Sequence, residues 1–456
     1  MLRKSTIIFM KKKKILIVGG GLVGSLWAVF LAKKGHDVSV FERRGDMRKE
    51  GYQGGRSINL AMSNRGWQAI EKAGVADEIR SVAIPMGGRM MHSAKGELTY
   101  QQYGKDGEAI YSVSRGGLNK ALLQVADNLD NVHFYFHKKC LGLDLENCKI
   151  RFEDDLSKER TTHRFDYIFG TDGAFSAVRN SLQKLPRFNY SQSYLDYGYK
   201  ELNIPPAQAR AFEMHKNALH IWPRGRFMMI ALPNPDDSFT CTLFMPFEGD
   251  DSFEKLTNEA AVQHFFEQYF ADTIPMMPDL LEDFFQNPTP SLVTVKCNPW
   301  HYKNVVLIGD AAHAIVPFYG QGMNAGFEDC VILDALLTDY QGDFDAAIAH
   351  FSKTRPKDAD AVAELALRNF IEMRDLVGDP MFLLRQKIAA DLYKKYPQDF
   401  TPLYSLVTFS HTPYSDALKE GLRQDTLFKK ILALENIAEN WQENEAVDKI
   451  FKNWLN

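Results

Sequence analysis

Three glycine-rich stretches contain the residue types and spacings that bind a dinucleotide. The first is Gly19-Gly20-Gly21-Leu22-Val23-Gly24, which follows the apolar run 15–18 and has the spacing G-x-G-x-x-G. In such a turn the first glycine allows the tight bend, the second lets the backbone approach a pyrophosphate, and the third lets the helix pack on the strand. The helix expected next would direct free N–H groups at the phosphates. We therefore predict that Gly19, Gly21 and Gly24 bind a dinucleotide.

An acidic residue stands where a dinucleotide fold needs one. Glu42 follows Gly24 by 18 residues and ends the predicted strand 38–41, so it is placed to accept a hydrogen bond from a ribose hydroxyl. The basic Arg43 comes next and is a further candidate for cofactor binding. The turn by itself does not distinguish NAD from FAD.

The other two stretches lie about 150 and about 290 residues further along the chain. Thr171-Asp172-Gly173 taken alone predicts only a turn. In the last stretch, the strand 305–309 precedes Asp310, whose carboxylate is placed to accept a hydrogen bond from a ribityl hydroxyl. A helix beginning near Met323 and Asn324 would direct its first N–H groups at the electron-rich edge of a flavin. Three unrelated turns would not explain this order and spacing.

The elements that must position these motifs can be read from the hydrophobic pattern. Residues 14–42 predict strand, glycine turn, helix and strand, and 86–103 predict a strand pair around Lys95-Gly96. Alternating runs between 190 and 295 predict a half-buried antiparallel sheet. The remaining predicted elements are helices at 66–81, 116–128 and 361–374, strands within 132–172, and a helix-rich segment from 322 to the end.

These elements predict a mixed α/β fold in which a Rossmann-like dinucleotide domain is interleaved with an antiparallel β-sheet domain that binds substrate. The dinucleotide domain is expected to comprise 12–80, 105–180 and 297–340. The substrate domain is expected to comprise 81–104 and 181–296, and a helical region is expected at 341–456.

Composition excludes several classes of protein. Lys and Arg number 54 against 58 Asp and Glu, so the chain lacks the basic excess of a dedicated nucleic-acid binder. Its five cysteines are scattered without a CxxC pair, which is typical of a reduced cytoplasmic protein and gives no metal site. The uncharged run 15–32 contains four glycines and divides into a strand and a helix, so we expect a soluble protein without a membrane anchor. The sequence leaves the oligomeric state open, with a homodimer as one option.

Together the three motifs resemble the FAD-dependent aromatic hydroxylases with the architecture of para-hydroxybenzoate hydroxylase, over about 14–340. Longer blocks resemble the kynurenine 3-monooxygenase family as far as about Tyr414. These blocks are residues 55–61, 84–93, 112–115, 309–329, 371–374 and 402–409.

The resemblance implies a reaction and a set of site residues. FAD would stay bound, NADPH would bind transiently as reductant, and O2 would add at the flavin C4a carbon before one oxygen atom is transferred to L-kynurenine. The product would be 3-hydroxykynurenine, in tryptophan catabolism and pyridine nucleotide biosynthesis. The implied substrate contacts are Arg89, Tyr103, Asn369 and Tyr404. The implied flavin contacts are Val23, Ala61, Arg115, Asp310, Met323 and Asn324.

The residues fit such a substrate. The forked donors of Arg89 suit a carboxylate, and Tyr103 lies almost symmetrically across the predicted hairpin, so both could hold the same group. Without the resemblance, a surface ion pair for Arg89 and core packing for Tyr103 would be the simpler interpretations. An aromatic amine already activates its ring, so we name no protein acid or base, and we interpret His313 as structural. The alternatives are a flavin monooxygenase of another aromatic acid and a non-catalytic protein of the same fold.

Overall fold

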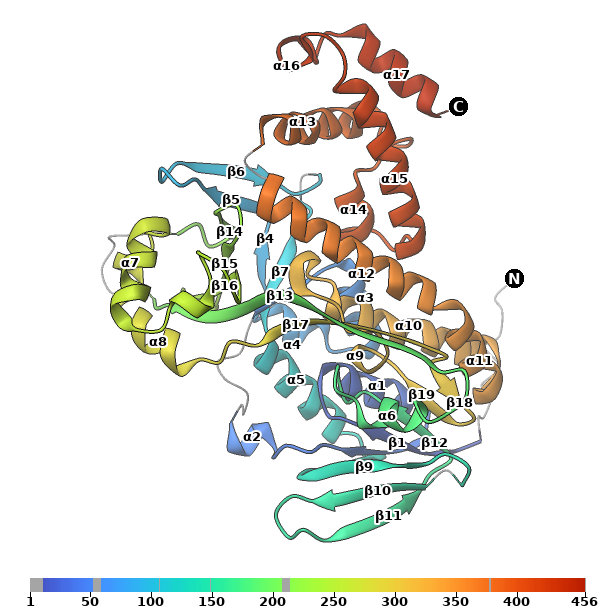
Figure 1. Cartoon of the computed structure of the whole chain (residues 1–456). Helices are drawn as coiled ribbons and strands as arrows, with labels where there is room; N and C mark the ends of the chain where they lie inside the picture. The colour runs from blue at the N-terminus through green and yellow to red at the C-terminus, as the bar shows by residue number, and fades with distance from the viewer. Residues whose placement is uncertain are drawn as a thin grey trace.

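The computed structural model describes residues 11–51, 59–105, 107–147, 149–206, 214–376 and 379–455 (Figure 1). Residues 55–58 of the block 55–61 lie outside this set. The described part of the chain contains two large sheets, two small sheets and a helical C-terminal region. The predicted mixed α/β class is therefore confirmed.

The first large sheet has six strands in the order β18-β19-β12-β1-β2-β8. All neighbours are parallel except β18 and β19, as expected for a dinucleotide fold. The glycine turn follows the central strand β1. The strands are β1 (Lys14–Val18), β2 (Asp37–Phe41), β8 (Val132–Tyr135), β12 (Tyr167–Gly170), β18 (His301–Tyr302) and β19 (Val305–Leu307).

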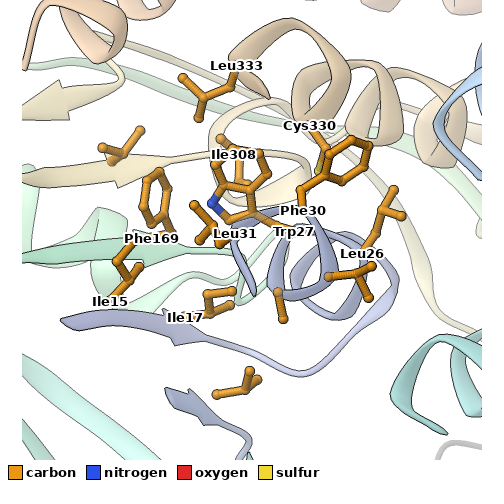
Figure 2. Packing of buried hydrophobic residues seen from close by; sticks show 14 of the residues in the cluster. Ile15, Ile17, Leu26, Trp27, Phe30, Leu31, Phe169, Ile308, Cys330 and Leu333 are labelled. Carbon is orange, nitrogen blue, oxygen red and sulfur yellow. The ribbon is translucent and has the colours of Figure 1, made fainter. Parts of the chain in front are cut away.

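Helices cover this sheet and create its core. Trp27 of α1 lies with its ring 5.4 Å from that of Phe169 on β12, and Figure 2 shows both packed beside Ile308 and Leu31. Residues 24–32 of α1 are all buried, because the helix is enclosed between the sheet and other helices. This burial accounts for the uncharged run 15–32. None of the described helices is long and apolar enough to cross a membrane. The helices around this sheet are α1 (Leu22–Lys33), α2 (Met47–Glu50), α5 (Arg115–Asp127), α6 (Ala177–Leu182), α9 (Asp310–His313) and α10 (Gly322–Asp339).

The region 66–81, predicted to be helical, is helical but interrupted. Two helices occupy this region, α3 (Asn64–Ala73) and α4 (Ala76–Arg80). Gly74 separates them with a left-handed φ of 70°, which ends α3. Beside α3 lies a small sheet in the order β3-β7-β4, with β3 (Asn59–Met62), β7 (Ile110–Ser114) and β4 (Ile84–Met86).

The second large sheet has seven strands in the order β17-β13-β16-β15-β14-β5-β6. The predicted hairpin is present as β5 and β6, and β5 joins the rest through a parallel pairing with β14. The sheet predicted over 190–295 is also interrupted by helices α7 (Glu259–Tyr269) and α8 (Leu280–Gln286), whose aromatic residues were read as strand. The strands are β5 (Gly88–His92), β6 (Leu98–Gln102), β13 (Asn189–Ile204), β14 (Ala218–Pro223), β15 (Met228–Pro233), β16 (Phe239–Pro246) and β17 (Ser291–Asn298).

A further small sheet, β11-β10-β9, lies beyond the first sheet and contains β9 (Lys138–Asp144), β10 (Lys149–Asp154) and β11 (Arg160–Arg164). The domain boundaries given above stay predictions.

The C-terminal helices α13 to α17 gather at one end of the molecule (Figure 1). Their apolar core includes Leu392, Leu427 and Phe451. The helix predicted over 361–374 ends at Ile371 and continues as a π-helical turn over Glu372–Leu376. The helices of this region are α11 (Phe344–Thr354), α12 (Pro356–Ile371), α13 (Pro380–Lys395), α14 (Leu403–Thr408), α15 (Tyr414–Ile431), α16 (Ile437–Asn440) and α17 (Glu445–Leu455).

Candidate functional site

The glycine turn after β1 has three glycines with different surroundings. Gly19 has a φ of +102°, and a Cβ there would lie 2.8 Å from the carbonyl oxygen of Thr171. A Cβ on Gly24 would overlap the carbonyl oxygen of Gly19. A Cβ on Gly21 would meet nothing within 4 Å. Gly19 and Gly24 therefore permit the turn itself, whereas Gly21 leaves open space beside the N-terminus of α1, as a bound pyrophosphate requires.

The acidic residue at the end of β2 lies over this turn. The backbone N–H of Gly20 donates to Oε2 of Glu42 at 2.8 Å, and that of Arg44 donates to Oε1 at 2.9 Å. Each carboxylate oxygen keeps a lone pair for a ribose hydroxyl. The Arg43 side chain is exposed beside it.

The second motif touches the first. The Thr171 hydroxyl lies 2.8 Å from the carbonyl oxygen of Gly19, and Asp172 accepts hydrogen bonds from the N–H groups of Ala177 and Val178 at the start of α6. The Thr171-Asp172-Gly173 turn is therefore part of the framework of the glycine turn, although sequence alone predicted only a local turn.

The third motif also meets the first. Gly309 has a φ of +60°, and a Cβ on either Gly309 or Gly326 would lie 3.0 or 2.7 Å from Cγ2 of Val23. The Val23 side chain therefore fits only because residues 309 and 326 are both glycine. Val23 thus fixes the distance between the turn after β1, the turn after β19 and helix α10.

Asp310 follows Gly309 directly, and solvent reaches its side chain. Its carboxylate has no hydrogen bond to the described residues, and the surrounding protein raises its pKa chiefly through desolvation, opposed by the charge of Arg115. An unpartnered carboxylate of this kind is suited to accept from a ligand hydroxyl. The exposed Arg115 at the start of α5 is placed to interact with the same ligand.

The first turn of α10 is held open toward the same region. The buried side chain of Asn324 donates to the carbonyl oxygens of Ala61 and Gly320 at 2.9 and 2.7 Å, and accepts from the N–H of Ser63 at 2.9 Å. The side-chain amide of Asn324 is therefore hydrogen-bonded to other parts of the protein. The Gln321 side chain does not cap the helix, which leaves the first N–H groups, including that of Met323, for a ligand. These observations fit FAD.

The predicted substrate residues Arg89, Tyr103 and Tyr404 lie together. Nε of Arg89 lies 3.3 Å from the Tyr103 hydroxyl, and the guanidinium lies 4.8 Å from the centre of the Tyr404 ring. The two tyrosine rings stack at 5.0 Å with an interplanar angle of 10°. Arg89 pairs with Gln101 in the sheet, so Tyr103 is its diagonal cross-strand neighbour, within reach as the hairpin predicted.

Tyr319 of the loop before α10 extends the stack, with its ring 5.6 Å from that of Tyr404. Burial raises the pKa of Tyr103 and of Tyr319 well above the ordinary value, since desolvation disfavours a phenolate. Both hydroxyls therefore stay protonated and can donate hydrogen bonds.

Asn369 lies on α12 near this group but is engaged by the protein. Its Nδ2 donates to the carbonyl oxygen of Phe318 at 2.6 Å, and the Phe318 ring stacks on Phe370 at 4.2 Å. The structure thus shows Asn369 fixing the loop that contains Phe318 and Tyr319, while contact with substrate stays a prediction.

Glu372 was missed as a site residue, although it lies in one of the resembling blocks. It follows α12 in the π-helical turn, where burial raises the pKa of its carboxyl against the opposing charges of Arg385 and Arg89. Only the tertiary fold brings this carboxyl near Arg89, and no local signal marked it. It brings a carboxyl group within electrostatic reach of Arg89.

Neither His92 nor His313 belongs to this group. His92 lies on β5 with its Nε2 2.8 Å from Nδ1 of His220, and its ring stacks on Trp222 at 3.9 Å. Because Arg89 and His92 are three residues apart on a strand, they face opposite sides of the sheet. His313 lies beneath the turn after β19. In the described part of the chain no cluster of His, Cys, Asp and Glu could hold a metal ion.

Known proteins match this chain over most of its length. A family described as the FAD binding domain matches residues 12–363. Kynurenine 3-monooxygenase of Flavobacterium psychrophilum is 49% identical over 97% of this chain and 98% of its own. That of Flavobacterium johnsoniae is 48% identical over 96% and 98%. A solved structure of 2-methyl-3-hydroxypyridine-5-carboxylic acid oxygenase is 19% identical, with a TM-score of 0.66 over 81% of this chain and 95% of its own, and shares the fold.

Proposed function

The chain belongs to the kynurenine 3-monooxygenase family of FAD-dependent monooxygenases, and from this premise we propose that it hydroxylates L-kynurenine to 3-hydroxykynurenine. FAD is its cofactor, NADPH its reductant and O2 its second substrate. The reaction belongs to tryptophan catabolism and supplies pyridine nucleotide biosynthesis.

The group of Arg89, Tyr103 and Tyr404 carries this proposal. Kynurenine has an amino-acid head joined through a ketone to an aniline ring. The forked guanidinium of Arg89 and the protonated hydroxyl of Tyr103 suit its carboxylate. The carboxyl group of Glu372 suits the ammonium of the same head. The group therefore favours a zwitterionic aromatic substrate over a simple aromatic acid.

The cofactor residues have separate tasks. Gly21 and the N-terminus of α1 hold the pyrophosphate, Glu42 the adenosine ribose, and Asp310 the ribityl chain. The first turn of α10 stabilises negative charge on the reduced flavin ring. Bound FAD supplies the redox chemistry that activates O2.

No protein base is needed on the substrate ring, since the aniline nitrogen already donates electrons to the carbon that is hydroxylated. The protein's contribution is to orient the ring and to exclude water. Phe318, Phe370 and Phe244 form a contiguous aromatic group beside the tyrosine stack, with Phe318 5.0 Å from Phe244. Such a wall favours transfer of oxygen to substrate over release of hydrogen peroxide.

The test is NADPH oxidation by the purified FAD-loaded protein in air, with and without L-kynurenine, with the product identified by mass and retention time. Strong stimulation with 3-hydroxykynurenine as product is expected. Stimulation that yields only hydrogen peroxide would mean that kynurenine mimics another substrate. Bound flavin without any stimulation would refute the substrate and keep the fold.

Two further features belong to the proposal. We place the protein in the cytoplasm, because Cys140, Cys241, Cys297 and Cys330 are free thiols, as in a reducing compartment. A homodimer stays a prediction. Light scattering on the purified protein would test it by measuring the molar mass in solution.

A further inference from the structure

A fully buried carboxylate lies directly beneath the turn that presents Asp310. Oδ2 of Asp329 accepts hydrogen bonds from the backbone N–H of Gly309 at 2.9 Å and from Nε2 of His313 at 2.6 Å. Its other oxygen, Oδ1, accepts from Nε of Arg355 at 2.8 Å. Asp329 is 0% exposed, and although burial opposes its charge, His313 and Arg355 hold its pKa below the ordinary value. The group is therefore an anion with three protein donors, two on Oδ2 and one on Oδ1.

The hydrogen bond to Gly309 fixes the direction of the chain at Asp310. Gly309 has a φ of +60° and a ψ of −147°, a conformation that glycine adopts easily and that leaves its N–H pointing away from the strand ladder. Asp329 is the acceptor for this N–H. The Gly309 carbonyl in turn accepts from the N–H groups of Ala312 and His313 and begins α9. Asp329 therefore anchors the one residue whose dihedral angles orient Asp310.

The same anion is the end of a buried chain of charges. Arg355, at the start of α12, also pairs with Glu328 at 2.7 Å, and Glu328 pairs with Arg65 of α3. The Arg65 guanidinium in turn donates to the carbonyl oxygens of Val407 and Thr412, close to α14. This chain holds the packing of the helices together, but only its last member, Asp329, touches the turn at Gly309.

We infer that Asp329 is a positioning residue for the flavin: through the Gly309 N–H it holds the Asp310 carboxylate in place to accept from the ribityl chain. The inference rests on the flavin site of the proposed function. The contact with His313, the last residue of α9, supports the same short helix that begins with Asp310.

An asparagine at this position tests the inference because it cannot satisfy the same donors. Three N–H donors face the two carboxylate oxygens, and an amide offers one oxygen and one donating nitrogen. If the amide nitrogen faces Gly309, the backbone N–H of Gly309 loses its acceptor. If it faces Arg355, the guanidinium loses its acceptor instead. Because Arg355 is a charged donor, we expect the amide nitrogen of D329N to face Gly309.

Glu328→Gln is the matched control. It breaks the pairs with Arg65 and Arg355 within the same chain of charges and does not contact Gly309. A loss of general packing lowers the melting temperature of both apoproteins. Only the loss of the Gly309 anchor weakens the binding of FAD.

The experiment titrates FAD into the wild-type, D329N and E328Q apoproteins, following flavin fluorescence, and records the melting temperature of each apoprotein and the visible spectrum of bound flavin. We expect the FAD Kd to rise at least tenfold in D329N and to stay within threefold of wild type in E328Q. Equal FAD affinity in D329N and wild type overturns the inference, as does an equal rise in both variants. If the wild-type apoprotein itself fails to bind FAD, the proposed function fails instead.

A second measurement needs no variant. In wild-type apoprotein the Gly309 amide is expected to exchange with deuterium as slowly as the amides of β1, because Asp329 already holds it. Rapid exchange of this amide in folded apoprotein overturns the inference even if D329N does not fold.

Discussion

Replacing Gly21 by alanine separates folding from cofactor binding. Gly21 precedes α1 with a φ of −74° and a ψ of −172°, an extended conformation that any residue adopts. A Cβ at this position meets no protein atom within 4 Å. The substitution is therefore compatible with the folded apoprotein, and the new methyl group lies in the space assigned to the pyrophosphate.

We expect Gly21→Ala to leave the stability of the apoprotein nearly unchanged and to weaken the binding of FAD. Alanine restricts the unfolded chain and so stabilises the apoprotein by about 0.4–1 kcal/mol, but it is a poorer helix N-cap than glycine, so the net change stays within about 1 kcal/mol. The methyl group prevents close approach of the phosphate to the backbone. We expect FAD to bind at least about tenfold more weakly, which corresponds to about 1.4 kcal/mol.

The assay measures the melting temperature of the apoprotein and the Kd for FAD by fluorescence titration. Gly24→Ala is the matched control, because its Cβ overlaps the carbonyl oxygen of Gly19 and should destabilise the apoprotein by about 1–3 kcal/mol. Wild-type FAD affinity in the Gly21→Ala protein would refute the assignment of the pyrophosphate to this turn. A fall in melting temperature equal to that of Gly24→Ala would refute the reasoning about open space.

Three other predictions concern different parts of the molecule. Arg89→Lys keeps the charge but loses the forked donors and the contact of the guanidinium 4.8 Å from the Tyr404 ring. The KM for kynurenine should therefore rise about 10- to 100-fold, with the affinity for FAD unchanged. An unchanged KM would exclude binding of the substrate carboxylate by Arg89. Asn369→Leu leaves the Phe318 carbonyl oxygen without its hydrogen-bond donor. The free energy of unfolding, measured with urea, should fall by about 1–3 kcal/mol. Unchanged stability would show that this hydrogen bond is dispensable. Burial lowers the pKa of His36 from 6.5 to about 4, so the unfolded state binds more protons in this range and stability falls as the pH drops from 6.5 towards 4. His36→Phe should therefore gain about 2 kcal/mol relative to wild type between pH 7.5 and pH 5, and a constant difference would contradict this.

The sequence predicted those parts of the fold that depend on local pattern. The strand–glycine turn–helix unit at 14–42, the hairpin 86–103 and the helix 116–128 were all visible, because hydrophobic period and glycine spacing are local properties. Helices α7 and α8 were missed within the region read as sheet, because short apolar runs rich in phenylalanine fit either period. The helical character of 66–81 was predicted, but the break at Gly74, whose left-handed conformation ends α3, was not.

For the candidate site, sequence and resemblance named residues whose meeting only the fold could create. Arg89 and Tyr103 are close along the hairpin, but Tyr404 reaches them from a helix about 300 residues away. Glu372 carried no local signal, since a carboxylate in a helical turn is ordinarily solvated. Its burial and its closeness to Arg89 follow from the packing around it.

By itself the sequence predicted a dinucleotide site, because the glycine spacing after β1 and the position of Glu42 are local features, and the longer blocks indicated the family by resemblance. Only the tertiary structure decided what supports them. A side chain at Gly21 would have free space, whereas one at Gly24 would overlap the carbonyl oxygen of Gly19. Asp329 anchors the Gly309 turn because α10 packs beneath it and leaves the carboxylate no partner but three buried donors. Such contacts join residues distant in sequence, and their geometry exists only after the layers of the fold have packed together.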